Sequence, residues 1–240
     1  FLSLILPEME KFVENYNPGT PYWDKQSTKT RKRLQPLLTE YMSDIATHYH
    51  TVARASKKPR DYGIAVREYR RYLQAFPKDK EAHNMNFLLA DALFESELYA
   101  ESAIEYEKSA YNYPSHEKSV EAGYSALFTY GKLYEVSINK KDKTFANQHL
   151  IQSLLKYSDT FPYDHRSPAI LLNTAENYYA LGEFKDAIQS TQLLVLIKSI
   201  NSDIQYKAWV IMAHSNFEIK NYAGAETAYS EALSNLHFSS

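Results

Sequence analysis

Histidines at close spacing are the first candidates for chemistry in this sequence. His48 and His50 resemble a pair of metal ligands, but a separation of two residues places them on different faces of a helix. No His-Glu-x-x-His sequence occurs in the chain, and no cysteine is present to supply a thiolate ligand or nucleophile. We therefore expect no metal site.

Two carboxylate-containing groups could act as acids or bases. Glu101 and Glu105 are one helical turn apart, which could pair two carboxylates for proton transfer, but an exposed polar helix face is the better interpretation. The run Asp164-His165-Arg166 follows Phe161-Pro162 without a nearby nucleophile, so it is interpreted as part of a turn. The chain has six scattered glycines and no phosphate-binding or dinucleotide-binding motif. We expect no catalytic residue, no enzyme activity and no cofactor.

The charge distribution is uneven. The chain carries a net charge of −2, which argues against nucleic-acid binding over its whole surface, but residues 1–80 sum to +6 and residues 81–240 to −8. The basic stretch from Lys25 to Arg33 could attract acidic partners, RNA or anionic lipid, and a solvated face is the alternative that we favour. We expect a protein or peptide partner and no nucleic acid.

No stretch of the chain is long and apolar enough to predict a transmembrane helix. The apolar run Phe1–Leu6 is far shorter than the roughly 20 residues that a membrane helix needs. Because the sequence opens with Phe, we expect a fragment or a processed product, and a signal peptide or lipid anchor ahead of it remains open.

An internal repeat organises most of the sequence. An aromatic residue is followed three positions later by Ala or Ser, which places a large and a small side chain on one helical face. The repeated phrases lie at 60–69, 99–106, 182–188 and 221–226. Ahead of them run further amphipathic segments, in which Ala92-Leu93-Phe94 and Ala126-Leu127-Phe128 are 34 residues apart. The building block is therefore helix, turn, helix.

These aromatic, small and proline markers at this spacing resemble the tetratricopeptide repeat family. The resemblance implies an all-α fold, a right-handed solenoid of helical hairpins with about five repeats and an N-terminal helical cap. Residues 1–45 are assigned to the cap or to a degenerate repeat, and residues 46–240 to the solenoid. The expected units are 46–79, 83–116, 117–163, 168–201 and 206–239.

The sequence departs from the family pattern at two kinds of position. The small residue that precedes the turn is Gly182 in one unit, whereas we place Arg60, Glu97 and Lys220 there in the others. The central unit carries an insertion around 136–143, and its register is left open.

The resemblance also implies where a partner would bind. First helices of stacked hairpins line a concave surface that suits an extended peptide or a helix. By repeat register the predicted groove residues are Arg54, Lys57, Phe87, Asp91, Phe94, Glu121, Phe128, Glu176, Tyr179, His214 and Phe217. Aromatic anchors beside carboxylates would grip apolar groups and pair with Lys or Arg of a partner.

The aromatic-Pro phrases Phe76-Pro77, Tyr113-Pro114 and Phe161-Pro162 look like those of bacterial envelope members of the family. We therefore expect a periplasmic or envelope-associated scaffold for protein–protein interaction that carries no transmembrane segment and could form a homo-oligomer. A cytoplasmic regulatory scaffold is the alternative, and an accessory module of an enzyme is a further one.

Overall fold

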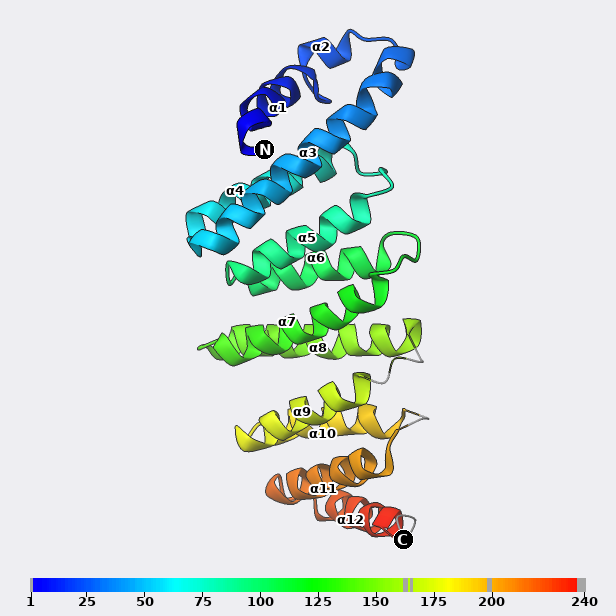
Figure 1. Ribbon diagram of the computed structural model, residues 1–240. Helices are drawn as coiled ribbons and strands as arrows, with labels where there is room; N and C mark the ends of the chain where they lie inside the picture. The colour runs from blue at the N-terminus through cyan, green and yellow to red at the C-terminus, as the bar shows by residue number, and fades with distance from the viewer. Residues whose placement is uncertain (1, 162–163, 165, 198–199, 237–240) are drawn as a thin grey trace. The chain divides into compact units, whose positions relative to one another are not determined.

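Helices form the whole regular structure of the described part of the chain. The computed structural model describes residues 2–161, 164, 166–197 and 200–236, and every regular element within these ranges is an α-helix (Figure 1). The chain divides into two compact units, Phe1–Thr129 and Tyr130–Ser240. The predicted all-α helical solenoid is confirmed in that hairpins of helices follow one another within each unit.

The N-terminal unit holds two complete hairpins behind two helices at its start. Its helices are α1 (Leu2–Tyr16), α2 (Pro21–Asp24), α3 (Thr28–Ser56), α4 (Pro59–Ala75), α5 (Ala82–Glu95), α6 (Tyr99–Tyr111) and the first part of α7 (Ser119–Val136). Helix α1 packs on α3, and the hairpins α3–α4 and α5–α6 pack through α4 and α5.

The C-terminal unit holds the end of α7 and five further helices. These are α8 (Lys140–Thr160), α9 (Ser167–Ala180), α10 (Phe184–Val195), α11 (Ser202–Glu218) and α12 (Tyr222–Leu236). The helices α9, α10, α11 and α12 each pack against the next in chain order, and α9 also contacts α11 directly.

Alanines, leucines and tyrosines fill the cores. In the N-terminal unit Leu38, Leu89 and Leu93 are fully buried, and Tyr69 and Tyr72 lie among them. The small side chain of Ala90 on α5 packs with Tyr106 of the neighbouring helix α6, so a small residue meets a large one between these helices. Burial of this kind stabilises the hairpins more than helix propensity does.

A left-handed residue closes the first helix of four hairpins. Glu97, Gly182 and Lys220 have φ of 63°, 74° and 64°, and the next residue in each case donates a backbone hydrogen bond to the carbonyl five positions before it. These bonds run from Leu98 N to Leu93 O, from Glu183 N to Tyr178 O and from Asn221 N to Asn216 O, at 2.8–2.9 Å. In each turn the amide of the left-handed residue also donates to the carbonyl three positions before it, at 2.9–3.0 Å. The two hydrogen bonds together satisfy carbonyls that the helix end would leave unpaired.

In the first of these hairpins the turn residue differs from our expectation. Lys57, with φ of 55°, occupies the left-handed position, and its amide donates to the carbonyl of Ala53 at 2.7 Å. Arg60, which we expected there, lies in the first turn of α4 behind Pro59. Proline at this position lacks the amide that would go unpaired, so α4 starts directly after α3 ends.

The predicted limit between residues 45 and 46 falls inside a helix. Helix α3 begins at Thr28, where the Ser27 hydroxyl accepts a hydrogen bond from the Thr30 amide, and continues through this limit to Ser56. The expected insertion at 136–143 is the end of α7 and the start of α8. Residues 162–163 of the expected third unit and 237–239 of the fifth lie outside the described residues.

Candidate functional site

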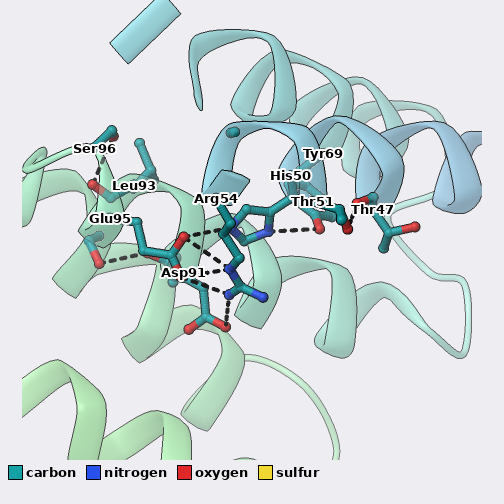
Figure 2. Close-up of polar contacts among 12 residues, drawn as sticks. Thr47, His50, Thr51, Arg54, Tyr69, Asp91, Leu93, Glu95 and Ser96 are labelled. Carbon is teal, nitrogen blue, oxygen red and sulfur yellow. Dashed lines mark hydrogen bonds and ion pairs between the residues drawn. The ribbon is translucent and has the colours of Figure 1, made fainter. Parts of the chain in front are cut away.

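A polar cluster joins the first helices of two successive hairpins, α3 and α5 (Figure 2). His50 on α3 is buried, with Nδ1 3.2 Å from the Tyr69 hydroxyl and Nε2 3.2 Å from Glu95 Oε2 on α5. Arg54, one turn further along α3, donates from Nε to Glu95 Oε1 at 2.9 Å and also lies 3.8 Å from Asp91 Oδ2. Both imidazole nitrogens are therefore engaged, and the cluster links α3, α4 and α5.

The pKa values in this cluster follow from burial and from Arg54. Burial raises the pKa of Asp91 above its ordinary value, and the hydrogen bond from Tyr106 and the charge of Arg54 only partly oppose this. Burial acts in the same sense on Glu95, but the hydrogen bonds and charge of Arg54, with those of His50, outweigh it and lower the pKa of Glu95. Burial, followed by the charge of Arg54, lowers the pKa of His50. The cluster thus favours a neutral imidazole beside a charged Glu95.

Two predicted groove residues, Arg54 and Asp91, belong to this cluster. The guanidinium of Arg54 contacts Glu95 and Asp91, and Asp91 also accepts a hydrogen bond from the Tyr106 hydroxyl at 2.5 Å. Lys57 is exposed at the end of α3. Arg54 and Asp91 therefore contribute to packing between hairpins, a role that spacing along the sequence did not reveal.

The other predicted groove residues of the N-terminal unit form an aromatic surface on α5 and α7. The ring centroids of Phe94 and Phe128 are 5.9 Å apart, and that of Phe87 is 5.4 Å from Tyr106. Lys118 lies over Phe87, with Nζ 5.1 Å from the ring centroid. Phe128 is 57% exposed, and Glu121, two helical turns before it on α7, is also exposed. This surface combines accessible aromatic area with charge of both signs.

Three of the predicted aromatic anchors occupy one structural position. Each lies three residues before a left-handed turn residue and contacts the aromatic ring that opens the next helix. The ring pairs are Phe94–Tyr99 at 5.2 Å, Tyr179–Phe184 at 5.6 Å and Phe217–Tyr222 at 5.6 Å. The repeat therefore places these aromatics beside the turns, where each ring also helps to fix the hairpin.

In the C-terminal unit the predicted residues lie along α9 and α11. The rings of Tyr179 and His214 are 6.0 Å apart, so this pair joins the first helices of two hairpins. His214 also contacts Tyr229 on α12 at 5.7 Å. Glu176 is exposed, and Phe217 is 54% exposed.

The residues that raised the possibility of acid–base chemistry are each paired elsewhere. Glu101 forms an ion pair with Arg70 at 2.5 Å, and Glu105 forms one with Lys108 at 2.6 Å and accepts a hydrogen bond from Asn86. Asp164 is held by Arg166 through two hydrogen bonds of 3.0 Å from Nε and Nη2, whereas His165 lies outside the described residues. The Glu101–Glu105 pair is thus divided between two different cations.

The basic N-terminal stretch contributes in part to local structure. Arg31 donates to the carbonyls of Trp23 and Asp24 at 3.0 and 2.8 Å, and its guanidinium lies 5.8 Å from the centre of the Trp23 indole. Lys32 and Arg33 are exposed.

The described residues include no group of three or more His, Cys, Asp or Glu side chains placed to hold a metal ion. None of the helices within the same ranges has both the length and the apolarity needed to cross a membrane.

The functional groups that sequence reasoning missed depend on contacts between hairpins. Glu95 meets Arg54 across 41 positions in the chain, and Asn147 meets Tyr178 across 31. The spacing of these residues in the sequence does not predict either contact, because each forms only when one hairpin packs on the next.

Comparison with known proteins gives one family match. Residues 53–117, from the end of α3 to the loop after α6, match the sequence model of the family described as Tetratricopeptide repeat. No curated protein matches the chain. Among solved structures, MamA is 16% identical over 81% of this chain and 91% of its own, with a TM-score of 0.44. BtubC (BKLC) from P. vanneervenii is 12% identical over 98% of this chain and 91% of its own, with a TM-score of 0.37.

Proposed function

We propose that this chain, whose residues 53–117 match the tetratricopeptide repeat model, is a non-catalytic scaffold that binds a segment of another protein on the exposed faces of its first helices. In the N-terminal unit these faces belong to α3, α5 and the start of α7, and in the C-terminal unit to α9 and α11. The partner is a peptide or protein.

The observation that carries this proposal is the exposure of large aromatic side chains at repeated positions. Phe128 and Phe217 leave more than half of their surface accessible, whereas Leu127 on α7 and Met212 on α11 are buried. Such side chains are typical anchors in protein interfaces, where they fill pockets of the partner. The exposed Glu176 supplies a carboxylate that would pair with a basic residue of the bound segment.

The test is affinity capture from the source cells with two matched double variants. Phe128→Ala with Phe217→Ala removes one exposed aromatic from a first helix of each unit. Leu155→Ala with Leu233→Ala removes equally exposed apolar side chains, 52% and 60% accessible, from the second helices α8 and α12. We expect the aromatic double variant to recover about tenfold less partner, and the leucine double variant to recover as much as the wild type.

Two outcomes would reject this proposal. If both double variants lose partner equally, the first helices do not carry the binding surface. If the aromatic double variant retains the same partners at the same yield, the exposed aromatics are not its anchors. Circular dichroism of each variant establishes that a loss of capture does not come from unfolding.

For the location, we keep the bacterial envelope as a proposal supported by the aromatic-Pro phrases, with the cytoplasm as the alternative. Fractionation of source cells with an antibody against the chain tests it, and recovery in the cytoplasmic fraction would contradict the envelope location.

A further inference from the structure

A pocket in the C-terminal unit takes none of its lining residues from α9 or α11, the first helices of that unit that we propose to bind the partner. It is formed by α8 and the start of α10, together with Tyr134 at the end of α7 and Ile138 in the following turn, and it encloses about 690 Å³. This volume is in the range of sites for small ligands or single side chains. The lining residues are Tyr134, Ile138, Lys140, Lys143, Thr144, Asn147, Gln148, Ile151, Gln152, Glu183, Asp186 and Gln189.

Tyr134, which lines the pocket, has a buried hydroxyl that lacks a partner among the described residues. Tyr134 is only 6% exposed, and its Oη makes no hydrogen bond to any residue that the structure describes. Asn147 beside it is equally buried, and its Oδ1 is occupied by the Tyr178 hydroxyl. Leaving a buried hydroxyl unpaired costs about 1–3 kcal/mol. A ligand that pairs with this hydroxyl would remove that cost.

Two carboxylates at the start of α10 make one side of the pocket acidic. Within the described residues, neither Asp186 nor Glu183 has a basic side chain close enough for an ion pair. Burial, and then the charge of Glu183, raise the pKa of Asp186 despite a hydrogen bond from Asn147 and the charge of Lys140. Burial and the same two carboxylates raise the pKa of Tyr134 to about 12. Within the described residues the two carboxylates therefore form no ion pair, and Lys140 acts on Asp186 only through its charge.

The part of the lining that comes from the start of α8 is basic. Lys140 is exposed, and Lys143 lies over the Tyr134 ring with Nζ 5.2 Å from its centroid. Neither lysine forms an ion pair within the described part of the chain. Ile138, which is 98% exposed, and Ile151 supply apolar surface to the pocket lining. The lining thus carries two charges of each sign, and the two signs come from different helices.

We propose that this pocket binds a ligand with a guanidinium at one end and a carboxylate at the other, as in free arginine or a C-terminal arginine residue. The guanidinium lies among Asp186, Glu183 and the Tyr134 hydroxyl, and the carboxylate meets Lys140 and Lys143. A guanidinium suits the acidic side because its five donors form a rigid planar fork that can reach several acceptors and stack on a ring. The site is separate from the proposed binding faces, because its residues do not come from α9 or α11.

The test is an NMR titration of the whole chain with four small probes. Nα-acetyl-L-arginine carries both charges, Nα-acetyl-L-citrulline replaces the guanidinium by a neutral urea, and Nα-acetyl-L-argininamide removes the carboxylate. We expect acetyl-arginine to bind about tenfold tighter than either of these two, since each removes one charge-assisted contact. Signals of Gln148 and Gln189 should shift, since both line the pocket. L-arginine is the fourth probe: tighter binding than acetyl-arginine identifies the free amino acid, and weaker binding identifies a C-terminal residue.

Three variants and one control separate binding from folding. Asp186→Asn and Glu183→Gln should each weaken the binding of acetyl-arginine about tenfold. Asp159→Asn makes an equal change of charge at the exposed end of α8 and should leave the binding unchanged. Tyr134→Phe should weaken binding while raising the urea midpoint of unfolding, because it removes the unpaired hydroxyl.

The proposal is overturned if acetyl-citrulline binds as tightly as acetyl-arginine, or if the shifted signals lie away from α8 and α10. It is also overturned if the Asp186→Asn and Glu183→Gln variants both bind acetyl-arginine as tightly as the Asp159→Asn variant does. None of these results bears on partner capture by the first helices, so the two proposals fail independently.

Discussion

His50 is a buried titratable side chain at the meeting point of α3 and α5, and its protonation should govern part of the pH dependence of stability. Its pKa lies below the ordinary 6.5 because of burial and Arg54. The unfolded chain then takes up the proton at a higher pH than the folded chain, so stability falls as the pH drops below about 6.5. We expect the His50→Gln variant to lose less stability than the wild type between pH 8 and pH 5.5.

Urea unfolding at each pH measures this difference, which one proton limits to about 1.4 kcal/mol per pH unit. At pH 8 the imidazole is neutral in both states, so this pH provides the reference for each protein. Parallel pH profiles of the two proteins would show that His50 is not the responsible group. Glu95, whose pKa is lowered, contributes stability that is lost only at more acidic pH, as the pH falls through the range below 4.5.

At the scale of the element, the closing turns of the first helices store backbone strain where a non-glycine residue occupies the left-handed position. Glu97 and Lys220 have nearly the same φ as Gly182 in an equivalent turn. The left-handed conformation costs a residue with a Cβ about 1–2 kcal/mol, while glycine adds roughly 0.4–1 kcal/mol of entropy loss on folding. We therefore expect Glu97→Gly and Lys220→Gly each to stabilise the protein by about 0.5–1 kcal/mol.

Gly182→Ala provides the reverse experiment, and it should destabilise the protein by a similar amount of about 1 kcal/mol. All three substitutions are measured by urea unfolding at neutral pH. A loss of stability in both glycine variants would show that the side chains of Glu97 and Lys220 make contacts that outweigh the backbone strain.

At the scale of the whole molecule, stability should be local because the helices of each unit pack mainly on their neighbours in the chain. Leu89 in the N-terminal unit and Leu154 in the C-terminal unit are both 1% exposed. Truncating either to alanine leaves a cavity and should cost about 2–5 kcal/mol. Hydrogen exchange should then speed up mainly in α3–α6 for Leu89→Ala and in α8–α10 for Leu154→Ala.

This locality distinguishes a repeat array from a chain with one cooperative core. If each variant raises exchange equally along the whole chain, the two units unfold together and the nearest-neighbour description is wrong.

The helical hairpins could be predicted from the sequence, but some of their limits could not. Aromatic and small residues three positions apart indicate a packed helix face without reference to any other part of the chain. The full length of α3 was not predicted because residues 28–45 lack the repeat phrase, although Leu38, Met42 and Ile45 form a buried face of this helix. The left-handed conformation of Lys57 was not predicted either, because a lysine in the sequence does not indicate that conformation.

The sequence by itself determined the all-α class, the repeat and the residues that lie on the first helices, since these depend on periodicity within one helix. Only the tertiary structure decided which side chains meet. It paired Arg54 with Glu95, placed Phe94 and Phe217 against rings of the next helix, and brought Tyr134 close to Asp186. Contacts of this kind depend on how one hairpin is seated on the next, and that seating follows from the fit of many side chains at once.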